Sequence, residues 1–227
     1  MDYEQDPFGA SDSQEFFDNP EPRCPVILLL DRSYSMSGAK INGLNEGLRH
    51  FHEELGMDGL AMKRVEVAVI SFGPVRTDSD FVSAAQFIPT HLEPDGSTPM
   101  GEAILTAIDM LQARKGRYRE AGVDFYRPWI FMITDGAPTD DVTEAKRRIS
   151  EGEASKQFMF YAVGVEGADI DRLTDLSVRA PLKLKGLAFR ELFAWLSNSL
   201  SSVSRSQTGD AIPLENPTAP DGWATAG

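Results

Sequence analysis

The sequence has a single cysteine and only three histidines among its 227 residues. One thiol, Cys24, cannot form a disulfide within the chain, and it cannot build a zinc site without histidine ligands. No apolar run approaches the roughly 18 residues that a membrane-spanning helix needs, because the longest, 26–30, has the length of a strand. These absences argue against a disulfide-stapled secreted domain and against a membrane protein, and they favour the reducing cytoplasm.

Basic residues are also scarce, since 22 Lys and Arg face 35 Asp and Glu, for a formal net charge of -13. Such a surface repels nucleic acids and anionic membranes, so neither is expected as a partner. The densest basic stretch covers residues 114–119. We interpret it as a helix C-terminus followed by a loop, and a docking patch for an acidic partner is the alternative.

The two ends of the chain differ in composition from the middle. Residues 1–23 are acidic, without the basic and apolar regions of a secretory signal, and they are expected to form a flexible tail without export. Residues 24–204 carry the apolar patterns of one domain, and residues 205–227 form a polar, Pro-rich tail. Trp223 in that tail could dock in a groove of this domain or of a partner.

Strand patterns alternate with helix patterns along the middle of the chain. Buried strands are predicted at 24–31, 65–73, 127–136 and 158–167, a weaker edge strand at 81–88, and a last strand near 181–186. Helices are predicted at 38–57, from 98 onward, at 141–156, at 168–176 and at 189–203. The connection 116–127 is predicted to be long; such connections are often functional, and an insertion without a role is the alternative. The order predicts an α/β fold with a doubly wound, mainly parallel sheet flanked by helices, and one antiparallel edge strand.

Oxygen-bearing side chains follow the predicted strands. Asp31 and Asp135 each come directly after a buried strand, and parallel strands bring such residues to one edge of a sheet. Asp31, Ser33 and Ser35 alternate along the chain, so their side chains point the same way. Thr98 stands at the head of a helix. Taken singly, either aspartate could be only a structural cap.

Two carboxylates and three hydroxyls, without sulfur or imidazole, are the ligands of a hard cation. Asp31, Ser33, Ser35, Thr98 and Asp135 therefore predict a site for Mg²⁺, with Mn²⁺ or Ca²⁺ as alternatives, rather than for zinc. The set leaves room for water and for one oxygen from outside the chain.

This pattern resembles the metal-ion-dependent adhesion site of von Willebrand factor A domains. The resemblance rests on D-x-S-x-S at 31–35, Thr98 within GSTPMGEAI and Asp135 within ITDG, and it covers roughly residues 24–203. Within the family the sequence looks most like the TerY-type proteins of the bacterial tellurium-resistance group. It departs from the common pattern at Tyr34, where relatives often have glycine.

The resemblance implies a role for each residue. Ser33 and Ser35 would bind the metal directly, Thr98 would bind it in one state, and Asp135 would often act through water. Asp31 would orient the cluster. A carboxylate from a protein partner would complete the coordination, and Tyr34 or Arg32 at the rim could shape that contact.

The expected function is therefore a non-enzymatic, metal-dependent protein-binding adaptor in the cytoplasm. By resemblance it would act in bacterial stress, tellurite resistance or phage defence, with a Ser/Thr kinase and a protein phosphatase as partners. A Mg²⁺-dependent phosphohydrolase of the haloacid-dehalogenase type is the alternative, although Ser33 stands where that chemistry needs a second acid. A serine hydrolase is weaker still, because no G-x-S-x-G motif is present. A structural protein whose site never binds metal is a third possibility.

Overall fold

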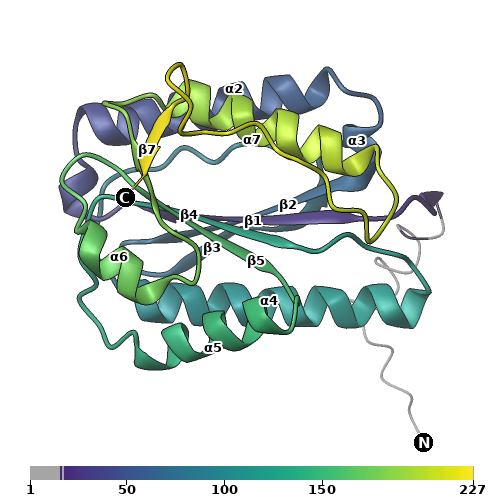
Figure 1. Ribbon diagram of the computed structural model, residues 1–227, viewed down its shortest axis with the longest axis horizontal. Helices are drawn as coiled ribbons and strands as arrows, with labels where there is room; N and C mark the ends of the chain where they lie inside the picture. Colours follow the sequence, from purple (N-terminus) through teal and green to yellow (C-terminus); the bar gives the residue numbers. More distant parts are fainter. Residues whose placement is uncertain (1–15, 17, 227) are drawn as a thin grey trace, which may run out of the picture.

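The centre of the molecule is a pair of buried parallel strands, β1 (Cys24–Asp31) and β4 (Trp129–Thr134). The computed structural model describes residues 16 and 18–226. Its sheet has the strand order β3-β2-β1-β4-β5-β6-β7, with helices on both faces (Figure 1). The predicted doubly wound, mainly parallel α/β fold is confirmed.

The remaining elements follow in chain order. The other strands are β2 (Val65–Phe72), β3 (Arg76–Ser83), β5 (Met159–Gly164), β6 (Leu182–Leu184) and β7 (Ala224–Ala226). The helices are the 3₁₀ turn η1 (Tyr34–Met36), α2 (Ala39–Gly56), α3 (Ala61–Arg64), α4 (Met100–Ala121), α5 (Thr143–Ala154), α6 (Ile170–Leu176) and α7 (Phe189–Ser204). None of these helices is long and apolar enough to cross a membrane.

Each face of the sheet has its own core because side chains alternate along a strand. Leu28 and Leu30 of β1 join the core under α2 and α7, whereas Ile27 and Leu29 join the core against α4 and α5. Figure 1 shows α2, α3 and α7 on one side of the sheet and α4, α5 and α6 on the other. Strands buried on both faces explain the continuous apolar runs in the sequence.

Both edges of the sheet are antiparallel. β3 pairs antiparallel with β2, as expected, but it covers Arg76–Ser83 rather than the predicted 81–88. The sequence misled here because an edge strand facing water can be polar, and its first five residues are charged or hydroxylated.

β7 at the other edge was not predicted. It pairs antiparallel with β6, and Trp223 just before it is 6% exposed, with its ring 5.6 Å from that of Trp195. Trp223 therefore docks on its own domain. The division of the chain at residues 23 and 204 stays a prediction, and most of the expected N-terminal tail, residues 1–15 and 17, lies outside the described residues.

The first half of the long loop predicted at 116–127 is instead helix. α4 continues to Ala121 and ends at Gly122, whose φ of 67° gives a left-handed cap. The basic stretch 114–119 lies within this helix, and Arg114 and Lys115 are buried at 3% exposure each. The charged side chains made this part of the helix resemble a loop, because arginine and lysine are usually exposed to solvent.

Candidate functional site

The site forms where β1 and β4 end at the same edge of the sheet. These strands run parallel in register, with Leu30 opposite Ile133, so Asp31 at the end of β1 and Asp135 just after β4 are neighbours. Both are buried, at 0% and 4% exposure. A sequence separation of about a hundred residues is thus bridged by strand pairing alone.

A chain of hydrogen bonds joins the serines to both aspartates. Ser35 Oγ donates to Asp135 Oδ1 over 2.7 Å and lies 2.9 Å from Ser33 Oγ. The backbone N–H of Ser33 donates to Asp31 Oδ1 over 2.8 Å. Ser35 lies within the turn η1, and Ser33 lies at its N-terminal end, directly after β1.

Thr98 reaches the site from the loop before α4. The Thr98 N–H donates to Thr139 Oγ1 over 3.1 Å, and the Thr139 N–H donates to the Thr98 carbonyl over 2.9 Å. A Cβ at Gly136 would lie 3.1 Å from Thr98 Oγ1 and 3.7 Å from Asp31 Oδ2. A Cβ there would be in tight contact with Thr98, and its closeness to both Thr98 and Asp31 shows that all five predicted residues are brought together.

Burial sets the electrostatics of the site. It raises the pKa of the Asp31 carboxyl, and the negative charge of Asp135 adds to the rise, while hydrogen bonds from Ser33 and Thr134 oppose it. Ser35 is the exposed member of the set and marks the opening to solvent. Two buried carboxylates that lie close together favour a nearby cation, because it offsets their mutual repulsion.

The residues present fit a hard divalent cation. Every side-chain donor is oxygen, from two carboxylates and three hydroxyls, which suits Mg²⁺, Mn²⁺ or Ca²⁺ better than soft metals. Within residues 16 and 18–226, no group of three or more His, Cys, Asp or Glu could hold a metal ion. A metal at this edge would therefore depend on the hydroxyls of Ser33, Ser35 and Thr98.

Two residues at the site were missed in the sequence. Thr134 Oγ1 donates to Asp31 Oδ2 over 2.5 Å, and Lys40 Nζ lies 2.5 Å from Asp135 Oδ2. Thr134 ends β4 one residue after Ile133, the partner of Leu30, so its place beside Asp31 could have been found from the expected pairing of the two strands. Nothing local in the sequence pairs Lys40 with a residue 95 positions away.

The rim contrasts an exposed aromatic with a buried arginine. Tyr34 is 66% exposed beside Ser35. Arg32 is only 5% exposed; its guanidinium lies 3.6 Å from Asp95 Oδ2 and donates to the Glu93 carbonyl. Arg32 thus contacts the 93–96 loop rather than facing solvent, whereas Tyr34 at the rim is exposed to solvent.

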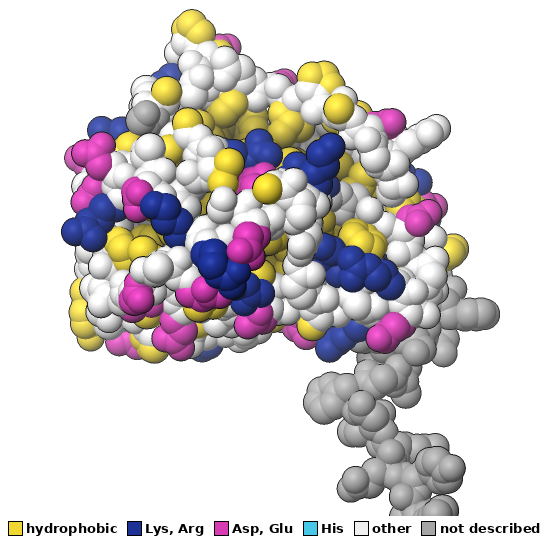
Figure 2. Space-filling view, turned by 60° about the horizontal axis from the view of Figure 1, so that its bottom comes forward, with side chains coloured by type: hydrophobic (Ala, Val, Ile, Leu, Met, Phe, Trp, Pro, Cys, Tyr) yellow, Lys and Arg dark blue, Asp and Glu magenta, His cyan; other side chains and the backbone are white. Residues whose placement is uncertain are grey.

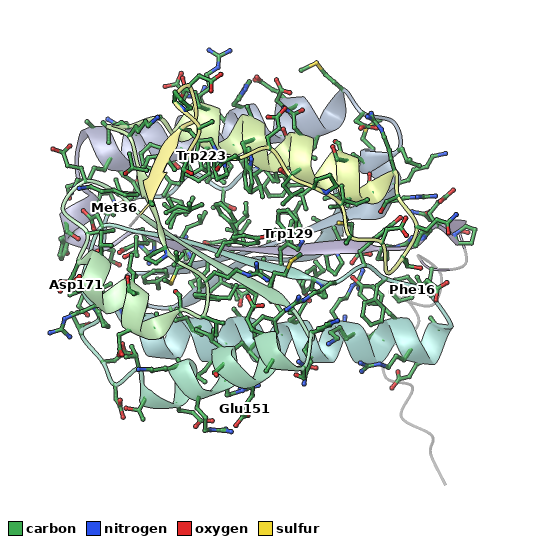
Figure 3. All side chains as sticks on the ribbon, in the orientation of Figure 1. Phe16, Met36, Trp129, Glu151, Asp171 and Trp223 are labelled. Atoms are coloured by element: carbon green, nitrogen blue, oxygen red, sulfur yellow. The ribbon has the colours of Figure 1, made fainter. Side chains whose placement is uncertain are left out.

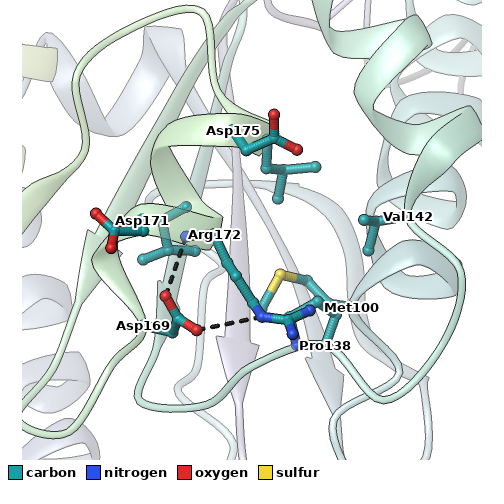
Figure 4. A pocket seen from close by; sticks show the side chains of 9 residues that line it. Met100, Pro138, Val142, Asp169, Asp171, Arg172 and Asp175 are labelled. Atoms are coloured by element: carbon teal, nitrogen blue, oxygen red, sulfur yellow. Dashed lines mark hydrogen bonds and ion pairs between the residues drawn. The ribbon is translucent and has the colours of Figure 1, made fainter.

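A shallow pocket adjoins the site between the start of α4, the β4–α5 loop and α6 (Figure 4). Met100 and Val142 contribute apolar lining. Asp169 accepts a hydrogen bond of 3.1 Å from the Arg172 backbone N–H and forms an ion pair of 3.2 Å with the Arg172 side chain.

On the face in Figure 2, basic and acidic side chains are interspersed without an extended patch of one sign.

Comparison with known proteins supports the fold. The family model of the von Willebrand factor type A domain matches residues 26–190. No curated protein matches the chain significantly.

Three solved structures illustrate the similarity. The pilus adhesin SpaC of Lactobacillus rhamnosus GG, in its open conformation, has a TM-score of 0.64 at 13% identity, over 82% of this chain and 31% of that one. The vWF domain of the type V pili tip protein Mfa5 of Porphyromonas gingivalis has a TM-score of 0.55 at 11% identity, over 85% of this chain and 99% of that one. Proximal thread matrix protein 1 of the mussel byssus, with a zinc-occupied MIDAS motif, has a TM-score of 0.54 at 13% identity, over 82% and 49%.

At these identities the similarity to the solved structures shows the fold alone. The chain spans about a third of the length of SpaC and about half of the length of the mussel protein. The family model assigns the chain, because its match runs from β1 into α7 and encloses all five predicted site residues. The chain belongs to the von Willebrand factor type A domain family.

Proposed function

We propose that this protein is a non-enzymatic binding module that grips a protein partner through a divalent cation at the edge of the sheet. The observation that carries the proposal is the convergence of two buried aspartates and three hydroxyls beside the exposed Ser35. A Mg²⁺ ion there, with Mn²⁺ or Ca²⁺ as alternatives, would supply a Lewis acid for a carboxylate oxygen of the partner.

The hydrogen bonds suggest how the residues divide the work. Ser33, Ser35 and Thr98 would hold the metal directly through their hydroxyl oxygens. Asp31 accepts from the Ser33 N–H and from Thr134, so it orients the cluster and would act through water. Asp135 has one oxygen bonded to Ser35 and the other to Lys40, which also favours a role through water.

The surroundings of Asp31 favour binding over phosphate chemistry. A phosphohydrolase of the haloacid-dehalogenase type needs an exposed carboxylate nucleophile and a second acid two positions later. Asp31 is 0% exposed with both oxygens accepting hydrogen bonds, and Ser33 occupies the second position. The phosphohydrolase remains the second candidate, and turnover of an aryl phosphate that is lost in Asp31→Ala would support it.

The partner is proposed from chemistry and resemblance. Two carboxylates carry no more negative charge than a divalent cation carries positive charge, so the metal would still attract an acidic side chain of the partner. Tyr34 offers an exposed aromatic surface beside the site. The TerY-like resemblance adds a cytoplasmic role in stress, tellurite resistance or phage defence, with a kinase and a phosphatase as partners. The net charge of -13 disfavours nucleic acids and membranes.

Metal-dependent melting and partner capture test the proposal together. The wild type should melt at a higher temperature with Mg²⁺ than with EDTA, and it should retain a partner only with metal. Ser35→Ala should lose both responses. Ser37→Ala is the matched control, because Ser37 lies in the same loop but donates to the Tyr34 carbonyl. Partner capture that is equally strong in EDTA would overturn the proposal. Repeating the melts with Mn²⁺, Ca²⁺ and Zn²⁺ identifies the preferred ion.

A further inference from the structure

Lys40 places a cation of the protein itself at the candidate metal site. Its Nζ lies 2.5 Å from Asp135 Oδ2 and 3.4 Å from the Ser35 carbonyl oxygen. The Lys40 side chain is 25% exposed, and the Asp135 side chain is 1% exposed. Because Asp135 is buried, water and salt screen this ion pair poorly. The attraction between the two charges is therefore stronger than in a pair on the surface.

The position of Lys40 opposes the preference of its own helix. Lys40 is in the first turn of α2, where the partial positive charge of the helix disfavours a basic residue. Helices α4, α5, α6 and α7 each carry an acidic residue in the first turn, and α2 carries none. The lysine is therefore explained by Asp135 and not by helix stability.

The neighbouring loop is shaped around the ammonium group. Gly167, between β5 and α6, has a φ of 96°, and a Cβ there would lie 3.7 Å from Lys40 Nζ. A larger side chain would be strained in this backbone conformation, and its Cβ would be in van der Waals contact with the ammonium. Three segments far apart in the sequence thus enclose Lys40: the turn after β1, the end of β4 and the loop after β5.

We propose that Lys40 is a resident counter-cation that holds Asp135 in the metal-free site and competes with the divalent cation for it. The inference rests on the proposed metal site. The ammonium compensates part of the charge of Asp31 and Asp135, so the site stays folded without metal. The same positive charge repels an incoming cation and keeps Asp135 Oδ2 engaged, so Lys40 lowers metal affinity and makes loading reversible.

Calorimetric titration with Mg²⁺ and with Mn²⁺ tests this role in the full chain. Lys40→Met keeps the aliphatic stem and removes the charge, and it should tighten metal binding by about tenfold. Lys40→Arg keeps the charge and should stay within about twofold of the wild type. Lys63→Met is the matched control, because exposed Lys63 precedes β2 at the opposite end of the sheet.

Melting without metal supplies the second measurement. Lys40→Met should melt below the wild type in EDTA and regain the difference in saturating Mg²⁺, whereas Lys63→Met should not show this pattern. Unchanged or weaker metal binding by Lys40→Met would overturn the inference and leave the proposed function standing. Binding by Lys40→Met alone, with none in the wild type, would support the inference and defeat the proposed function. Absence of binding in both would defeat both.

Discussion

The two ends of the sheet each bury carboxylates, and they compensate them in opposite ways. At the amino end, Glu66 of β2 is 0% exposed and accepts from Arg23 Nε and Arg114 Nε, each over 2.9 Å. Tyr118 also donates to it, and the Phe16 ring lies 4.9 Å from the Arg114 guanidinium carbon. Figure 3 shows Phe16 at this end and Met36 of η1 at the other.

At the carboxyl end, Asp31 and Asp135 have hydroxyls and a single lysine. Lys40 forms an ion pair with Asp135, and Ser35 leaves the cluster open to solvent. The carboxylate of Glu66 is fully compensated by its two arginines and its tyrosine, so this cluster has a structural role. Lys40 offsets one of these two negative charges, and this difference supports the proposal that the carboxyl end binds a further cation while the amino end stabilises the fold.

The largest effect is expected from breaking the amino end. Glu66→Gln leaves Arg23 and Arg114 buried without their counter-charge, and it should lower the free energy of unfolding by about 3–5 kcal/mol. Urea unfolding measures the loss, and the exposed Glu120→Gln on α4 is the control. Metal affinity of the folded variant should not change. A loss below about 1 kcal/mol would contradict the structural role of this cluster.

Tyr118→Phe should have a smaller effect that depends on pH. Burial raises the pKa of Tyr118 well above its usual value of 10.0, and the charge of Glu66 adds to the rise. The unfolded tyrosine therefore ionises first, so the wild type loses stability as pH rises through and above that value.

The variant should lose about 1 kcal/mol at neutral pH, from the missing hydrogen bond to Glu66. It should also show a shallower decline in alkali than the wild type. Urea unfolding across the alkaline range measures both, and parallel curves for the two proteins would disprove the link.

Asp31→Asn should change stability by less than about 1 kcal/mol without metal, because it removes a buried charge while keeping the shape. It should nevertheless abolish the rise in melting temperature caused by Mg²⁺. Thermal melts with Mg²⁺ and with EDTA check both parts. A stability loss as large as that of Glu66→Gln would erase the contrast between the two ends.

Cys24 at the start of β1 should show the smallest effect, an absence of reaction. Burial raises the pKa of this thiol to about 12, and Glu66 adds to the rise. At about pH 8 almost no thiolate forms, so a thiol reagent should label it only as fast as the chain unfolds. Urea should restore rapid labelling. Fast labelling of the native protein would show that the amino end opens more readily than its packing implies.

Local patterns in the sequence determined the parallel sheet and the position of the aspartates. Apolar runs such as 24–31 announce strands buried on both faces, and a polar residue at the end of such a strand lies at the sheet edge. The position of β3 and the last turns of α4 were missed, since polar residues on an edge strand and buried basic residues such as Arg114 and Lys115 on a helix both resemble loop sequences.

Sequence alone thus determined the fold and a set of five residues whose oxygens suit a hard cation: Asp31, Ser33, Ser35, Thr98 and Asp135. The metal itself stays a prediction. Only the tertiary structure decided that Lys40 pairs with Asp135, that two arginines enclose Glu66, and that Trp223 brings β7 to the sheet. These contacts join residues dozens of positions apart, and a local pattern cannot specify which distant charge or groove a side chain will meet.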